Sequence, residues 1–127
     1  MDGGEAAFLL LDEIESGAEA ARGKHPIMAD AVWTAAETLR ETTEWMIEQT
    51  DMQDRFAGAV PFLMGFARVL GAHFHLKSAI AEGGKGKRTE LARFHINRLL
   101  PEHASNLAQA RCGAAGLYTL STEDLAS

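Results

Sequence analysis

The sequence predicts an all-α fold, an antiparallel up-down four-helix bundle, on the strength of three observations. Apolar residues recur at alternating steps of three and four over four long segments, which is the spacing of an amphipathic helix. Alternating β-branched runs and Asn-Gly hairpins, which would indicate strands, are absent from the sequence. The connections between the four segments are short, as in up-down bundles. The expected helices cover residues 4–21, 26–49, 52–82 and 89–115 of one helical domain, residues 1–127.

The first two expected helices are separated by a short break at residues 22–25. Gly23 is the expected stop, because glycine readily adopts the conformation that ends a helix. Pro26 is expected at the first position of the next helix, where its missing N–H costs nothing. The sequence therefore predicts a helical hairpin that reverses direction within a few residues.

The third expected helix, residues 52–82, carries small residues at every seventh position. These positions form one nearly straight seam, which would let another backbone come unusually close. Because each glycine inside a helix costs about 0.5–1 kcal/mol relative to alanine, close packing is the expected compensation. Pro61 is expected in the first or second turn, where a missing N–H costs least. The seam consists of Gly58, Gly65, Ala72 and Ala79.

Three glycines within four residues predict a flexible connection after the third helix: Gly83, Gly84 and Gly86. The fourth helix, residues 89–115, should be kinked at Pro101, because a proline inside a helix removes a hydrogen bond and clashes with the preceding turn.

Net charge argues against one class of partner and suggests how the two hairpins meet. The formal net charge of −6 argues against nucleic-acid binding, which depends on neutralising phosphates. Residues 1–54 hold 13 acidic and 3 basic residues, whereas residues 55–127 hold 5 acidic and 9 basic residues. We therefore expect an acidic first hairpin to lie against a basic second hairpin, although each exposed pair contributes only about 0–1 kcal/mol.

The most apolar stretch is too short to indicate a membrane span. Its uninterrupted run extends over twelve residues, Phe56 to Ala67, whereas a spanning helix needs about 20. Arg68 would then lie within the bilayer, at a cost of several kcal/mol. The N-terminus also lacks the basic region of a secretory signal. Because Cys112 is the single cysteine, no disulfide can form within the chain, and we expect a reducing, cytoplasmic environment.

No motif in the chain predicts catalysis, cofactor binding or metal binding, so the expected catalytic, cofactor-binding and metal-ligating residues are none. The Glu-x-x-His pairs of di-iron bundles are absent from the sequence. His73 and His75 would point to nearly opposite faces of a helix, and His95 and His103 are too far apart to chelate locally. We expect these histidines on the surface or as hydrogen-bonded interior groups. A metal-dependent bundle enzyme, with ligands from different helices, stays open as an alternative.

Three further features were considered as sites: the glycine-rich segment 83–89, the single cysteine, and a charged pair between two helices. The segment 83–89 departs from a P-loop, because Arg88 replaces the hydroxyl residue after Gly86-Lys87, and predicts a solvated basic loop. Cys112 is expected to be a buried, inert residue. Folding at the glycine-rich connection should bring Arg68 level with Glu102, which predicts a partly buried ion pair.

Two tryptophans lie twelve residues apart in the second expected helix, which places them roughly 120° apart around the helix axis. They therefore cannot both lie on one narrow side of the helix. We expect one of them, Trp33 or Trp45, to pack inside and the other to meet a partner. A free-standing helical interaction module that binds a protein through this face is therefore an alternative function.

Three segments resemble a known family: "AGAVPFL" at 57–63, "ARFHINRLLP" at 92–101 and "CGAAGL" at 112–117. They are similar to the extra helical domain that ends one branch of the acyl-CoA dehydrogenases, which includes the enzymes acting on 3-methylmercaptopropionyl-CoA. The opening "DGG" resembles the segment leading into that domain. The family often has tyrosine where Phe62 and His95 stand here, so a polar contact made by those tyrosines is expected to be changed.

The resemblance implies a parent enzyme that uses FAD to oxidise an acyl-CoA thioester to its 2-enoyl-CoA. In that family the catalytic base and the flavin pocket belong to the preceding domains, and no residue here matches them. The resemblance therefore implies a non-catalytic C-terminal domain of a larger flavoenzyme, which packs on the catalytic domains or on another subunit of a homo-oligomer. FAD and acyl-CoA are expected in the parent and not in this chain.

Overall fold

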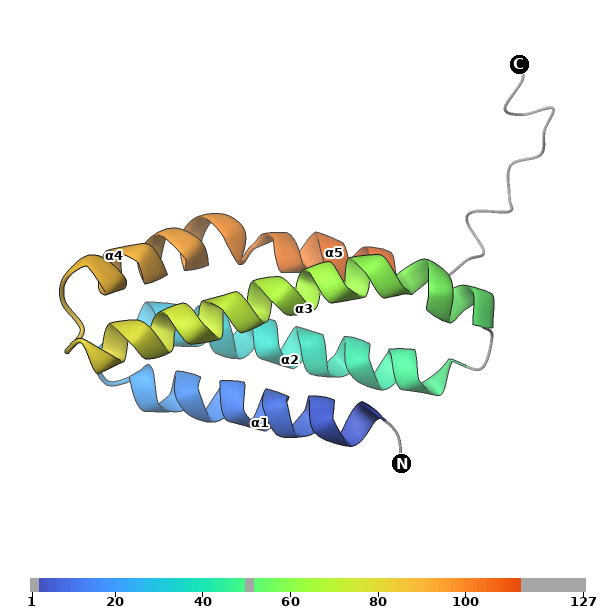
Figure 1. The fold of residues 1–127 in the computed structure, drawn as a ribbon, viewed down its shortest axis with the longest axis horizontal. Helices are drawn as coiled ribbons and strands as arrows, with labels where there is room; N and C mark the ends of the chain where they lie inside the picture. Colours follow the sequence, from blue (N-terminus) through green and yellow to red (C-terminus); the bar gives the residue numbers. More distant parts are fainter. Residues whose placement is uncertain (1–2, 50–51, 113–127) are drawn as a thin grey trace, which may run out of the picture.

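The computed structural model describes residues 3–49 and 52–112, and these residues form helices and connections without a strand. The helices are α1 (Gly3–Ala21), α2 (Pro26–Glu48), α3 (Met52–Ala81), α4 (Lys87–Phe94) and α5 (Glu102–Ala110), with a π-helical turn, η1 (His95–Leu99), between the last two. The all-α prediction is confirmed. Figure 1 shows that α1, α2, α3 and the α4–α5 segment lie alongside one another, with reversals of direction between them.

The first three helices match their predicted ranges closely. α1 ends two residues before Gly23, and Pro26 begins α2, as expected. Pro61 differs from the prediction: since α3 begins at Met52, the proline lies in the third turn. Its position leaves the carbonyl of Ala57 without the usual helical donor, which costs helix stability.

The fourth predicted helix is divided into α4, η1 and α5, so residues 3–49 and 52–112 hold five α-helices and not four. The division has a physical cause in Pro101, which cannot donate a hydrogen bond to the preceding turn. The helix widens here into a π-helical turn, in which the N–H of Leu100 donates a hydrogen bond to the carbonyl oxygen of His95, 2.9 Å away. The predicted kink is therefore spread over η1. α5 ends at Ala110, and residues 113–115 of the predicted helix lie outside the described residues.

The connection between α3 and α4 is built on glycines with positive φ. Gly83, Gly84 and Gly86 have φ angles of 96°, 81° and 115°, which other residues rarely adopt. The Glu82 carboxylate closes the turn by accepting a hydrogen bond of 2.9 Å from the Thr89 N–H. This side chain takes the place of a cap on α4, which explains why the helix begins at Lys87 and not at Thr89.

α3 is the central helix of the fold, because it packs against α1, α2, α4 and α5. The core is built of aliphatic side chains from several helices, and full burial of each such side chain contributes about 1.5–3 kcal/mol. Its largest fully buried apolar members are Leu11, Ile14, Val32, Leu39, Val69, Leu76 and Leu107.

The small-residue seam of α3 faces this core, as predicted. Gly58, Gly65, Ala72 and Ala79 are all buried. A Cβ atom at Gly58 would lie 2.5 Å from the carbonyl oxygen of Ala110, and one at Gly65 would lie 2.6 Å from Cδ2 of Leu107. The seam therefore accepts the backbone and side chains of α5, so the two helices pack closely.

The charge prediction is met only in small part. Ion pairs of the acidic first hairpin lie mainly within it, since Arg40 of α2 pairs with Asp12 and Glu15 of α1 at 2.8 and 2.7 Å. Between the two halves, the described ion pair joins Lys77 to Glu13 at 4.0 Å. The half-buried guanidinium of Arg40, which the sequence analysis did not identify, thus joins α1 to α2.

Candidate packing surface

The side of α3 that faces away from the core is apolar and exposed. Val60, Leu63, Met64 and Phe74 are 65%, 63%, 49% and 51% exposed, and Ala67 lies among them. We call these five residues the outer face of α3. Their spacing places them along one side of the helix, and Val60, Ala67 and Phe74 are separated by seven residues, as at the seam of a coiled coil. The outer face is therefore an apolar stripe that another helix or an apolar surface could cover.

The same helix thus has two apolar sides, and the described residues cover only one of them. In its most apolar window, within Ala57–Ala81, 28% of the residues are buried. This stretch has a mean hydropathy of 1.3, so its length and composition alone would allow it to cross a membrane. The core helix of a soluble protein can pass the same test, so the absence of a membrane span stays a prediction. A contiguous exposed apolar surface of this kind is typical of an interaction site.

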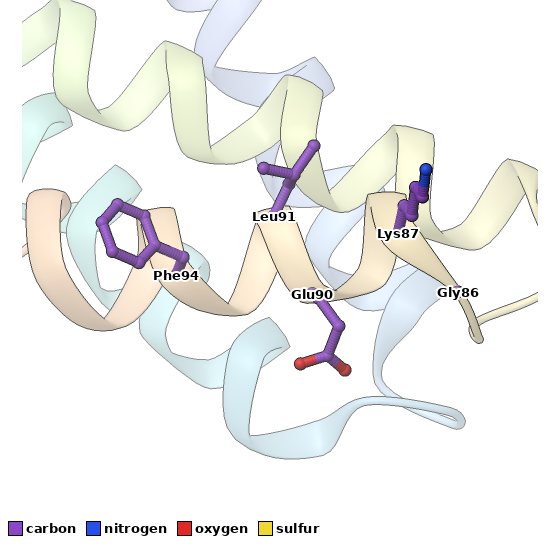
Figure 2. A pocket seen from close by; sticks show the side chains of 5 residues that line it. All are labelled: Gly86, Lys87, Glu90, Leu91 and Phe94. Atoms are coloured by element: carbon purple, nitrogen blue, oxygen red, sulfur yellow. The ribbon is translucent and has the colours of Figure 1, made fainter.

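A second apolar surface lies on α4, around an open hollow of about 800 Å³. Leu91 and Phe94 line the hollow and are 55% and 57% exposed. Figure 2 shows Leu91 and Lys87 on one side of α4 and Glu90 on the other. The guanidinium of Arg98 lies 5.9 Å from the centre of the Phe94 ring, within range of a cation–π interaction. This surface combines exposed apolar groups with charged ones. The solvated basic loop expected at residues 83–89 is shorter than predicted, because Lys87 begins α4 and Thr89 is buried.

Two histidines face the interior of the fold. His95 of η1 is 9% exposed, and its Nε2 lies 3.2 Å from the carbonyl oxygen of Arg68. Gly71 makes room for the ring, because a Cβ there would lie 2.9 Å from Cε1 of His95. His73 is 3% exposed, and its Nε2 has no hydrogen-bond partner among the described residues. The prediction of surface or hydrogen-bonded interior histidines is therefore confirmed for His95 and wrong for His73.

Both buried imidazoles have a lowered pKa, each chiefly because burial disfavours the charged ring. For His73 the carboxylate of Glu13 opposes this effect and the ammonium group of Lys77 adds to it. For His95 the hydrogen bond to the Arg68 carbonyl opposes it, and the positive charges of His75 and Arg68 add to it. His75 stacks on His95 with ring centres 4.7 Å apart. The folded chain therefore binds protons at these two rings less readily than the unfolded chain does.

We expect the free energy of unfolding to fall as the pH is lowered from 7.5 to 5.5. The unfolded chain takes up protons at both histidines near pH 6.5, whereas the folded chain, with lower pKa values, does not. Urea unfolding at both pH values measures the change. The variant His95→Gln, which cannot titrate at this position, should show a smaller loss. An equal loss in the variant, or a wild-type chain that is more stable at pH 5.5, would contradict this assignment.

The ion pair predicted from the sequence is present. Nη2 of Arg68 lies 2.6 Å from Oε1 of Glu102, and the two side chains are 34% and 51% exposed. The pair joins α3 to the start of α5. Because both groups reach solvent, its contribution to stability is modest.

Two expectations about single residues are wrong. Cys112 is exposed and not buried, because it follows the end of α5. Trp33 and Trp45 are both partly buried, whereas one was expected inside and the other on an interaction surface. Trp33 packs against the core and lies 6.0 Å from the guanidinium of Arg22, which shields part of its ring. The tryptophans therefore do not define a docking face.

Metal chemistry finds no support in the part of the chain that the structure describes, where no group of three or more His, Cys, Asp or Glu residues could hold an ion.

Phe62, which stands where the family often has tyrosine, packs edge-on against Phe66 with ring centres 5.9 Å apart. An apolar contact thus occupies this position. The strongest functional candidate is consequently the outer face of α3, which the sequence analysis missed although the seven-residue spacing of Val60, Ala67 and Phe74 could have indicated it.

Residues 10–121 match the model of a family described as acetyl-CoA dehydrogenase C-terminal like. The chain belongs to this family, whose members accompany FAD-dependent dehydrogenases. Comparisons with curated proteins and with solved structures gave no match.

Proposed function

We propose that this chain is the non-catalytic C-terminal domain of an acyl-CoA dehydrogenase-like FAD enzyme, and that it packs through the outer face of α3. The observation that carries the proposal is the exposed apolar stripe along one side of the central helix. Burying its four large side chains in a larger assembly would remove several partly exposed apolar groups from water, each worth up to about 1.5–3 kcal/mol. The surface that covers them would be a catalytic domain of the same chain or a neighbouring subunit of a homo-oligomer.

The parent reaction that we propose is the oxidation of an acyl-CoA thioester to its 2-enoyl-CoA, with the flavin and the catalytic base in the preceding domains. The segments quoted for the resemblance support the branch that acts on 3-methylmercaptopropionyl-CoA. We also propose a cytoplasmic enzyme without a membrane span, in which α4, η1 and α5 together form the fourth arm of an up-down bundle. A free-standing module that binds through the tryptophans of α2 is not favoured, because both tryptophans are partly buried.

The proposal is tested first by reading the genomic frame that precedes Met1. We expect a flavoenzyme frame that continues into this chain. A start codon preceded by an unrelated gene would contradict the proposal.

The outer face is then tested in the full-length enzyme with the double variant Leu63→Ser and Phe74→Ser. Both side chains are exposed in this chain, so the domain should still fold, whereas subunit or interdomain packing should weaken. Light scattering should show a smaller assembly, or kinetics should show an altered acyl-CoA range. The control is Ile27→Ser, which changes an apolar residue that is 82% exposed on α2. An oligomer and kinetics identical to wild type in the double variant would count against the outer face as the packing surface.

A further inference from the structure

The outer face of α3 is arranged evenly about Ala67, its middle residue. Val60 lies seven residues before Ala67 and Phe74 lies seven residues after it. Each is therefore about 10 Å from Ala67 along the helix axis. Val60 and Phe74 are 65% and 51% exposed, and Ala67 is exposed between them. The face thus has a large apolar side chain toward each end and a small one at its centre.

The two halves of the face differ in height. On the N-terminal side of Ala67, Leu63 and Met64 project from the helix and are 63% and 49% exposed. At the same distances on the C-terminal side lie Gly71 and Leu70, which are both partly buried. Since glycine has no side chain, the backbone itself forms the surface at Gly71. One half of the face is therefore raised and the other half is recessed.

A two-fold axis beside Ala67 would place the raised half of one copy against the recessed half of another. In such a symmetric contact the same patch is used by both subunits, so each pair of facing residues occurs twice. When the two α3 helices run antiparallel, residues equally far from Ala67 on opposite sides lie at the same level. Leu63 then lies level with Gly71 of the partner subunit, and Met64 with the partner subunit's Leu70. The shape of the face is therefore complementary to itself.

The charges around the outer face also suit a contact between two like copies. Near a two-fold axis each side chain approaches its own counterpart, so a charge there would meet a like charge, which costs several kcal/mol. All five residues of the outer face are uncharged. Between residues 60 and 81, the cationic residues of α3 other than histidine are Arg68 and Lys77. They pair with Glu102 at 2.6 Å and with Glu13 at 4.0 Å, so neither brings an unpaired charge to the contact.

The area of the outer face shows where such a contact can form. A stable interface buries about 800 Å² on each partner. A whole aromatic side chain buries about 150–250 Å², and the four large side chains of the face are 49–65% exposed, so the face offers roughly 400 Å² per copy. The isolated chain should therefore stay monomeric at micromolar concentration. The contact needs the additional area that the catalytic domains of an assembled enzyme provide.

From this arrangement we infer that the outer face of α3 pairs with the same face of a second copy, with the two helices antiparallel and a two-fold axis beside Ala67. The inference rests on the proposed function, because the contact forms within the assembled flavoenzyme. Of the two surfaces named above as a cover for the face, it selects the neighbouring subunit.

The experiment is disulfide formation in the full-length enzyme, in a Cys112→Ser background because Cys112 is exposed. Ala67→Cys places one thiol beside the axis in each subunit, and a bond between two residues 67 can form only between copies. A disulfide needs Cα atoms about 4.4–6.8 Å apart, which the small side chain at the centre of the contact allows. We expect mild oxidation to give a covalent dimer, in which mass spectrometry finds residue 67 joined to residue 67.

The control is Glu41→Cys, on the exposed side of α2. Two thiols held beside an axis have an effective concentration in the millimolar range, whereas free collision depends on the enzyme concentration. With the enzyme at micromolar concentration, the bond at residue 67 should form at least about 100-fold faster than the bond at residue 41.

The double variant Val60→Cys and Phe74→Cys tests the direction of the pair. Antiparallel helices place residue 60 of one subunit level with residue 74 of the other, so a disulfide should join these two positions. Within one helix the two residues are about 21 Å apart, so the bond cannot form inside a subunit. Parallel helices would instead give bonds between identical positions, 60 to 60 and 74 to 74, and this result would overturn the inference.

Protection of residue 63 from thiol labelling separates this inference from the proposed function. If neither the 67–67 nor the 60–74 bond forms in an enzyme whose residue 63 is protected, a catalytic domain covers the face. The inference would then be overturned while the proposed function remains. If residue 63 is labelled as fast as in the isolated chain and neither bond forms, both are contradicted.

Discussion

The variant Gly58→Ala is expected to lower the free energy of unfolding by about 1–3 kcal/mol, the usual cost of overfilling a packed core. The added methyl group would lie 2.5 Å from the carbonyl oxygen of Ala110, which is backbone and can move only with α5 itself. Ordinarily alanine would stabilise a helix by about 0.5–1 kcal/mol relative to glycine, so a loss of stability carries the opposite sign from helix propensity. Chemical denaturation of the two chains measures the difference.

The matched control is Gly23→Ala, because a Cβ at Gly23 meets no atom within 4 Å and its φ is not positive. This variant should unfold within about 0.5 kcal/mol of wild type. If Gly58→Ala were as stable as Gly23→Ala, the close approach of α3 to α5 would be refuted.

Leu107→Ala should cost still more, about 2–5 kcal/mol, because Leu107 is only 1% exposed and its removal leaves a cavity beside α3. Gly65→Ala should also destabilise the chain, since its methyl group would lie 2.6 Å from Cδ2 of Leu107. The two substitutions act on the same space. In the double variant the new methyl group occupies part of the cavity, so the combined loss should be smaller than the sum of the two single losses. Unfolding free energies of the four chains, including wild type, complete this cycle.

A combined loss equal to the sum would contradict the prediction, because it would show that residues 65 and 107 do not share a contact. Ala72, which lies one heptad further along the seam, is fully buried as well. The cycle thus tests whether the small-residue seam acts as the packing surface for α5.

Much of the fold could be predicted from the sequence because its signals are local. The 3.6-residue periodicity and the break before Pro26 depend on neighbouring residues, so α1, α2 and α3 were predicted nearly to the residue. The inward direction of the seam followed from the cost of glycine inside a helix. The pairing of Arg68 with Glu102 followed from helix length alone, once the chain was assumed to reverse near residue 85.

The features that were predicted incorrectly depend on how the helices pack in three dimensions as well as on local backbone preferences. The chain widens into η1 ahead of Pro101, where a simple kink was expected, because the lost hydrogen bond can be compensated in more than one way. The burial of His73, whose Nε2 has no hydrogen-bond partner in residues 3–49 and 52–112, depends on the distance between α1 and α3, which no sequence pattern encodes. The outer face of α3 could not be separated from the buried side by sequence pattern, because apolar residues occur on both sides of this helix.

The proposed function depends on the outer face of α3 being covered in the parent enzyme, and thiol labelling tests this most directly. Leu63→Cys places a thiol on the face at a position that is 63% exposed in the isolated chain. Its labelling rate is followed by mass spectrometry of the peptide that contains residue 63, in the isolated chain and in the full-length enzyme, with Glu41→Cys on the exposed side of α2 as control. We predict labelling at least about tenfold slower in the enzyme at position 63 and little change at position 41, since tenfold protection corresponds to about 1.4 kcal/mol of burial. Equal labelling of position 63 in both proteins would contradict the account.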